Sequence, residues 1–270
     1  MSDTFIEIDH VSFGYDERRR ILDDVSLKFR RGQVTAILGA SGCGKTTLMR
    51  LIAGVHGATS GRVVFDGELV DAHDREQLYR LRRRLGMLFQ FGALFTDLSV
   101  FDNVAFPLRE MTDLPESLIH DIVLMKLNAV GLRGAAKLKI SEVSGGMARR
   151  IALARAIALD PELIMYDEPF AGLDLISMGV AAKLIRTLND VTGATSLVVS
   201  HDVPECMAIS DHVVLMAAGG RIVAQGAPAE LMASTDAEVR QFVRGEPDGP
   251  VKFHYPAVEM ADDFGLGVRP

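Results

Sequence analysis

The stretch GASGCGKT, from Gly39 to Thr46, constrains the fold of this chain more than any other part of the sequence. It matches the pattern G-x-x-x-x-G-K-[ST] and stands between the apolar run QVTAIL and the helical pattern TTLMRLIAG. A buried strand, a glycine-rich turn and a helix in this order point backbone N–H groups at a phosphate chain. The stretch therefore predicts an α/β fold with a nucleotide-binding phosphate loop.

The side chains of this loop have distinct expected roles. Lys45 would bind the β- and γ-phosphates of ATP, and the Thr46 hydroxyl is a ligand of the kind that Mg²⁺ accepts. Cys43 is open to two interpretations: a thiol whose pKa is lowered near a helix N-terminus, or a small filler side chain. The predicted nucleotide contacts in the loop are Gly39, Ser41, Gly42, Cys43, Gly44, Lys45, Thr46 and Thr47.

Composition excludes several classes of protein. The net charge of −7 argues against a chain that coats nucleic acid, and no nucleic-acid partner is expected. The two cysteines indicate no disulfide framework and fit a reducing cytoplasm. The N-terminus lacks the pattern of a signal peptide, and about 18 consecutive apolar residues occur nowhere. A role at a membrane would therefore need a partner.

Periodicity predicts the order of the elements. Residues 1 to about 40 are β-rich, the block from about 96 to 160 is helical, and strands then alternate with helices. The other expected elements are a strand in GRVVFDG, a basic helix over 74–85, strands in LGMLFQ, ELIMYDE and TSLVVS, helices over 175–190 and 203–209, and a hairpin of DHVVLM and RIVAQG.

Two carboxylates close the apolar run LIMYDEP, which spans Leu163 to Pro169. A buried parallel strand ends at the edge of its sheet where ligands bind. Asp167 is predicted to reach Mg²⁺ directly or through water, and Glu168 to polarise the water that attacks the γ-phosphate. Alone, such a run is often only a strand end that reaches solvent, but here it follows a phosphate loop.

A third motif, VSGGMARRIALARAIALDPELIMYDEP, indicates the family. Ser144, Gly145 and Gly146 lead into a helix and form a second anion-binding turn, although a serine–glycine turn alone is common. The stretch resembles the LSGGQ signature of ABC-type ATPases and lies, as in that family, just upstream of the carboxylate strand. Val143, Met147 and Leu175 depart from the usual family pattern, which leaves the contacts of the last signature position in question.

The resemblance extends over about residues 5–240 and implies further roles. Gln90 resembles the Q-loop glutamine that senses Mg²⁺ and water, Asp174 the D-loop aspartate, and His201 the switch histidine at the γ-phosphate. Tyr15 resembles the aromatic residue that stacks on adenine. A lone histidine after a strand is often only a surface residue, and an aromatic residue like Tyr15 often packs at a strand end, but the positions of both residues favour the switch role for His201 and adenine stacking for Tyr15.

The same resemblance implies the architecture: a P-loop NTPase of ABC type with a mainly parallel core sheet, an N-terminal antiparallel β-subdomain and an inserted helical subdomain. The ATPase domain is expected over 1–245 and a C-terminal extension over 246–270. In the family the signature of one subunit completes the phosphate site of another. Because this chain has one of each, we expect a homodimer with ATP at its interface.

The stretch FQFGALFTDLSVFDNVAFPLRE, from Phe89 to Glu110, contains five phenylalanines and only four charged residues. In ABC transporters this region receives helices of the membrane subunits, so we expect the phenylalanines to line such a groove. About half of them are expected to be core residues.

Four stretches narrow the resemblance: FQFGALFTDLSVFDNVAFPLRE, MKLNAVGLRGAAKL, VSGGMARRIALARAIALDPELIMYDEPF and VVSHDVPE. They closely resemble the ATPases of the Mla phospholipid transporters of Gram-negative bacteria. That resemblance implies two ATPases at the cytoplasmic face of the inner membrane, with an MlaE-type permease, an MlaB-type STAS-domain protein and MlaD-type lipid-binding subunits. The implied task is phospholipid movement between inner and outer membranes. The alternatives are an amino-acid or other small-solute importer and a soluble non-transport ABC ATPase.

Two weaker features remain. The arginines of Arg80 to Arg84 face either acidic lipids, a partner or plain solvent. The tail segment VKFHYPAV is either floppy or a docking arm for the other ATPase subunit.

Overall fold

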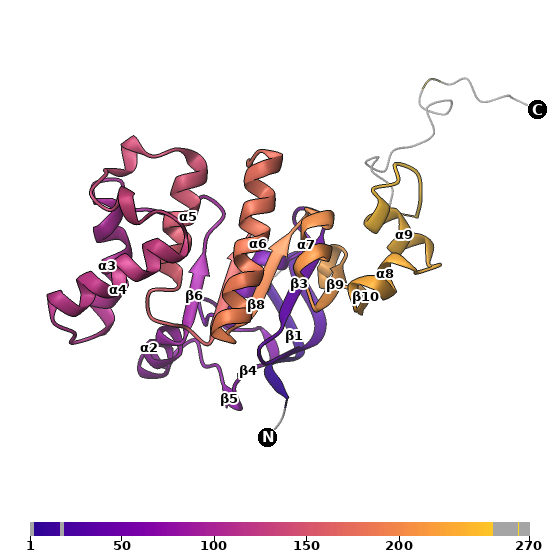
Figure 1. Ribbon diagram of the computed structural model, residues 1–270. Helices are drawn as coiled ribbons and strands as arrows, with labels where there is room; N and C mark the ends of the chain where they lie inside the picture. Colours follow the sequence, from indigo (N-terminus) through magenta and orange to yellow (C-terminus); the bar gives the residue numbers. More distant parts are fainter. Residues whose placement is uncertain (1–2, 17–18, 251–263, 265–270) are drawn as a thin grey trace, which may run out of the picture.

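The computed structural model describes residues 3–16, 19–250 and 264, and these form two sheets with helices around them (Figure 1). The tail predictions for 251–263 and 265–270 lie outside the described residues. The strands are β1 (Thr4–Asp16), β2 (Arg19–Arg30), β3 (Val34–Gly39), β4 (Ser60–Phe65), β5 (Glu68–Leu69), β6 (Leu85–Leu88), β7 (Leu163–Asp167), β8 (Thr195–Ser200), β9 (His212–Met216) and β10 (Ile222–Gly226).

The larger sheet has the strand order β10-β9-β3-β8-β7-β6. Strands β3, β6, β7, β8 and β9 run parallel, and β10 closes the sheet as an antiparallel partner of β9, as the sequence predicted. Every residue of β3, β7 and β8 is buried, which explains their continuous apolar sequences. Because parallel strands end at one edge, Gly39, Asp167 and Ser200 meet there.

The smaller sheet, β2-β1-β4-β5, is antiparallel. Its inner side chains, among them Phe5, Phe29 and Phe65, pack with Leu48 and Met49 of the first helix in one apolar core. Four charged residues join this sheet to the larger one through ion pairs. Arg84, which follows the second helix, contacts Asp66 and Glu162, and Arg31 of the region after β2 contacts the same two carboxylates.

The helices are α1 (Lys45–Ile52), α2 (Arg75–Arg83), α3 (Val100–Met111), α4 (Glu116–Ala129), α5 (Gly145–Ala156), α6 (Leu175–Thr192), α7 (Val203–Ile209), α8 (Pro228–Met232) and α9 (Ala237–Arg244). Helices α3, α4 and α5 gather on one side of β6, at the left of Figure 1. They fall within the stretch predicted to be helical. Helices α8 and α9 lie beyond β10 at the other end of the sheet. Among the described residues no helix has both the length and the apolar character needed to cross a membrane.

Two sequence-based expectations differ from the structure. Helices α8 and α9 were not predicted, although the Asp236 carboxylate accepts from the N–H groups of Glu238 and Val239 and marks the start of α9. The arginines near the end of α2 are not simply a lipid-facing or solvated patch. Arg82 donates to the carbonyl groups of Ala53 and Gly54, and Arg84 belongs to the ion-pair cluster above.

Helix α6 offers a matched test of the packing. Ile185 is 1% exposed and Ile176, on the same helix, is 80% exposed. We expect Ile185→Ala to lower the free energy of unfolding by about 2–5 kcal/mol, because the core cannot fill the space that the side chain leaves. Ile176→Ala should change it by less than about 0.5 kcal/mol. Urea unfolding of both variants measures this, and equal losses would contradict the burial of α6.

Candidate nucleotide-binding site

The phosphate loop lies at the edge of the larger sheet where β3, β7 and β8 end. It forms one side of a pocket of about 370 Å³. Most of the predicted nucleotide and catalytic residues line this pocket together. The lining residues are Tyr15, Arg19, Ile21, Ser41, Gly42, Gly44, Lys45, Thr46, Thr47, Gln90 and Glu168.

The backbone of the loop requires glycine at two positions. Gly44 has φ +109°, and a Cβ atom there would lie 2.6 Å from Leu22 Cδ2. A Cβ atom on Gly39 would lie 2.2 Å from the carbonyl oxygen of Met216. Glycine therefore lets the loop curl tightly between its neighbours, with its peptide groups available to an anion.

Cys43 is buried behind the loop and lines no part of the pocket. Burial raises the pKa of its thiol, and the nearby Lys45 only partly opposes this. The expectation of a lowered thiol pKa is therefore wrong, and the interpretation of Cys43 as a filler side chain holds. Gly39 is likewise buried, at the end of β3.

Lys45 is only 5% exposed and bonds within its own loop. Its amino group donates to the carbonyl oxygens of Gly39, at 2.6 Å, and Ala40, at 3.2 Å. The same nitrogen lies 3.9 Å from Glu168 Oε1. The cation of the loop after β3 is thus held near the carboxylate that follows β7, two strands away in the sheet.

Thr46, which lines the pocket, contacts Asp167 at the end of β7. The Thr46 hydroxyl donates to Asp167 Oδ1 over 3.0 Å. Asp167 is buried, and burial raises the pKa of its carboxyl while the hydrogen bond from Thr46 opposes the shift. A hydroxyl and a carboxylate, both hard oxygen ligands beside a phosphate loop, form a donor set that fits Mg²⁺.

Glu168 follows β7 directly, in a left-handed conformation with φ 49°. Its Oε2 atom accepts from the Ser200 hydroxyl at 3.2 Å and lies 2.8 Å from His201 Nδ1. The imidazole is more than half exposed, whereas the carboxylate is nearly buried. The structure therefore brings Glu168 and His201 together, and it adds Ser200, which the sequence analysis did not single out.

Tyr15 stands at the rim of the pocket. Its hydroxyl oxygen lies 3.3 Å from Thr47 Oγ1 and accepts from Arg50 at 3.2 Å. The ring packs edge-on against Phe13 and His56, yet 55% of the residue is exposed. Strand-end packing thus occurs, and it leaves much of the ring accessible for a base. Arg50 is a second residue that the sequence analysis missed.

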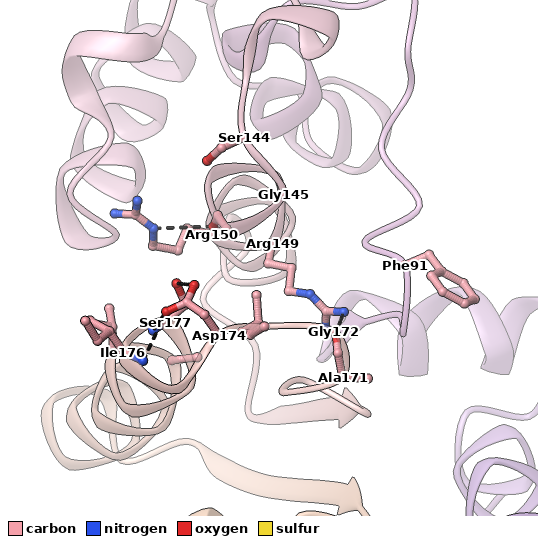
Figure 2. Close-up of a pocket in the computed structure, with 14 residues that line it drawn as sticks. Phe91, Ser144, Gly145, Arg149, Arg150, Ala171, Gly172, Asp174, Ile176 and Ser177 are labelled. Carbon is pink, nitrogen blue, oxygen red and sulfur yellow. Dashed lines mark hydrogen bonds between the residues drawn. The ribbon is translucent and has the colours of Figure 1, made fainter.

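Ser144, Gly145, Gly146 and Asp174 line a different and larger pocket, of about 840 Å³, shown in Figure 2. The Ser144 hydroxyl caps α5 by accepting from the Met147 N–H. Asp174 caps α6 in the same way, and its bonds with Ser177 lower the pKa of its carboxyl. The two pockets share no lining residue. One copy of the chain therefore keeps its signature turn apart from its phosphate loop.

Two arginines of α5, also missed from sequence, bind backbone carbonyl groups. Arg149 donates to Glu168, Pro169 and Ala171. Arg155 donates to Gly92 at 2.7 Å and Ala93 at 2.8 Å, shortly after Gln90. An arginine in an amphipathic pattern looks like a solvated residue, so the sequence carried no signal for these contacts.

An apolar groove of about 450 Å³ runs beside the Gln90 segment and includes Phe89, Phe95 and Phe106. None of the five phenylalanines between Phe89 and Glu110 is buried: four are exposed, and Phe101 packs partly against the helical core. The expectation that about half are core residues was therefore wrong. The interior of this region is filled by smaller side chains such as Val100 and Val104.

The fold and the site define a class. A family model described as "ABC transporter" matches residues 22–171, and this chain belongs to that family. In solved structures the fold resembles cbiO1 of Clostridium perfringens, part of the ABC transporter complex cbiONQ, with a TM-score of 0.80 and 30% identity over 91% of this chain and 96% of that one. It also resembles dimeric MJ0796 bound to ADP and Pi, with a TM-score of 0.75 and 26% identity over 83% of this chain and 98% of that one.

Within the family, the chain is similar to proteins named "Intermembrane phospholipid transport system ATP-binding protein MlaF". The Escherichia coli K12 protein is 58% identical over 91% of each chain. The Haemophilus influenzae protein is 54% identical over 98% of this chain and 99% of its own. The Mycobacterium tuberculosis H37Rv protein named "Probable ribonucleotide transport ATP-binding protein mkl" is 39% identical over 86% of this chain and 64% of its own.

The buried Asp167 carboxyl predicts a pH-dependent stability. The pKa of this carboxyl lies above the ordinary 3.8 in the folded chain, so ionisation of Asp167 opposes folding. The resulting loss of folding stability grows as pH rises above the ordinary pKa. Asp167→Asn should therefore be more stable than wild type at about pH 7, and the gap should shrink toward about pH 4. Urea unfolding at both pH values measures it, with the exposed Asp97→Asn as control. A less stable Asp167→Asn protein at neutral pH would contradict the prediction.

Proposed function

We propose that this chain is the ATP-hydrolysing subunit of an ABC transporter that moves phospholipid between the inner and outer membranes. The observation that carries the chemistry is the convergence of Lys45, Thr46, Asp167, Glu168 and His201 at one edge of the sheet. The substrate class is supported by 58% identity to relatives that are named for intermembrane phospholipid transport.

Each residue has a role in hydrolysis. The loop N–H groups and Lys45 bind the phosphates, so Lys45 exchanges its carbonyl contacts for phosphate oxygens. Glu168, oriented by Ser200 and His201, takes a proton from the water that attacks the γ-phosphate. Tyr15 stacks on the adenine base.

Mg²⁺, when bound, neutralises charge on the β- and γ-phosphates, and Thr46, Asp167 and Gln90 are the residues that would hold it. Thr46 and Asp167 are already within hydrogen-bond distance of each other. The amide of Gln90 lines the same pocket from the segment beside the apolar groove.

Two copies of the chain complete the catalytic unit. Because the signature turn and Asp174 line a pocket separate from the phosphate loop, they act on ATP held by a second copy. ATP then lies between the two copies and holds them together, and hydrolysis releases them. The dimeric form of MJ0796 provides a precedent in a similar fold.

Glu168→Gln tests this arrangement. The amide cannot accept the proton, so hydrolysis should fall by about 10²–10⁴, while ATP binding remains. The variant should accumulate as an ATP-bound dimer, measured by size-exclusion chromatography with light scattering. Lys45→Ala is the control, because it should lose ATP binding and stay monomeric. A monomeric Glu168→Gln protein that hydrolyses ATP normally would refute the model.

The apolar groove beside Gln90 is the proposed contact with the membrane partner. A helix of an MlaE-type permease would lie across Phe89, Phe95 and Phe106. It would move when the Gln90 segment moves. We therefore propose that the chain works at the cytoplasmic face of the inner membrane. The other proposed components are an MlaB-type STAS-domain protein and MlaD-type lipid-binding subunits.

Purification of the tagged chain from its native membrane in mild detergent tests the transported substrate. We expect a multispan permease, a STAS-domain protein and bound phospholipid by mass spectrometry. Phe95→Asp, in the groove, should release the permease, while Val191→Asp, at an exposed apolar residue of α6 outside the groove, should not. A different permease with a solute-binding protein would instead favour a small-solute importer; the more distant mycobacterial relative is named for ribonucleotide transport.

A further inference from the structure

Arg149 of α5 reaches from the signature helix to the chain segment that follows β7. One guanidinium nitrogen donates to the carbonyl oxygens of Glu168 and Pro169, each at 3.0 Å, and the other donates to Ala171. Figure 2 shows the side chain extending from α5 to this segment. No ion pair involves Arg149 within the described part of the chain, and burial lowers the pKa of its guanidinium. Within the described residues, all hydrogen bonds of this guanidinium go to backbone carbonyl groups.

Glu168 needs such support because its backbone is strained. A residue with a side chain rarely adopts φ 49°, and it keeps that conformation only where contacts on both sides fix it. On one side, the Glu168 N–H donates to the carbonyl oxygen of Val199 over 2.8 Å. On the other side, its carbonyl oxygen accepts from Arg149. The two hydrogen bonds together fix the backbone on both sides of the Glu168 Cα atom, and this backbone conformation directs the carboxylate toward Ser200 and His201.

We propose that Arg149 is a positioning residue for Glu168: it fixes the strained backbone so that the carboxylate stays beside His201. This inference rests on the proposed ATPase function. Arg149 lines the signature pocket but not the phosphate pocket of its own chain, so its effect on the phosphate site of that chain passes through Glu168. Because its helix begins at Gly145, the same contact joins the signature turn to the catalytic carboxylate of its own chain.

The first test compares variants of the full-length chain. Arg149→Met removes the donors at similar length and should lower kcat by about 10- to 100-fold, since a small displacement of a catalytic group has effects of this size. The KM and Kd for ATP should stay within about twofold of wild type. The kcat of Arg149→Lys should lie between those of wild type and Arg149→Met, because an ammonium group cannot span three carbonyl groups as a planar guanidinium does.

Arg186→Met is the matched control. Arg186 also donates to a backbone carbonyl group, that of Ile209, and pairs with Asp190 and Asp211. It lies on α6 and lines neither pocket. Its loss should lower the melting temperature and leave kcat within about twofold. A similar loss of kcat in both variants would mean that Arg149 acts only through stability, which would overturn the inference.

A double-mutant comparison separates positioning from general structure. If Arg149 acts through Glu168, Arg149→Met should cause no further loss of single-turnover rate in a Glu168→Gln background. Losses that multiply, or an unchanged kcat for Arg149→Met alone, would overturn the inference. If Arg149→Met does not fold, Arg149→Lys in the same two backgrounds decides it. A wild-type chain that binds ATP without hydrolysing it would instead refute the proposed function.

Discussion

The hydrogen bond between Thr46 and Asp167 depends on the order of strands in the larger sheet. Thr46 lies in the first turn of α1, which follows β3; Asp167 ends β7, and β8 lies between those two strands. Parallel strands that end at one edge are therefore needed to bring a hydroxyl and a carboxylate within 3.0 Å across 121 positions of sequence. The positions of Lys45, Glu168 and His201 follow from the same arrangement. Burial of β3, β7 and β8 on both faces keeps these ends in place.

The charged side chains gathered at this edge of the sheet lower the stability of the folded chain. Asp167 is buried and forms no ion pair with any residue that the structure describes, and Lys45 is nearly buried 3.9 Å from Glu168. Glu168 adds backbone strain, with φ 49°. Groups like these are commonly found where a site is prepared for charge that a ligand brings. The two apolar cores on either side of the sheet supply the stability that this site lowers.

The sequence predicted the parts of the site whose signal is local. An apolar run that ends in a glycine-rich loop, in Asp167–Glu168 or in His201 can be recognised within a few residues, and the parallel sheet brings the three ends together. Ser200, Arg50, Arg149 and Arg155 could not be recognised in this way. Their partners are carbonyl groups or side chains that become neighbours only in the folded chain. The prediction that about half of the phenylalanines between Phe89 and Glu110 are buried was wrong for a related reason. Composition indicates a tendency to be buried, but it does not show which surfaces of the folded chain remain open.

The open apolar groove has a consequence for how much of this chain a cell retains. A partner that binds only the folded state stabilises it in proportion to the logarithm of its concentration. A copy without a partner lacks that stabilisation and leaves Phe89, Phe95 and Phe106 exposed to water. Chaperones and proteases continuously sort chains on such differences in stability. The steady-state amount of the chain should therefore rise and fall with the supply of the proposed membrane partner.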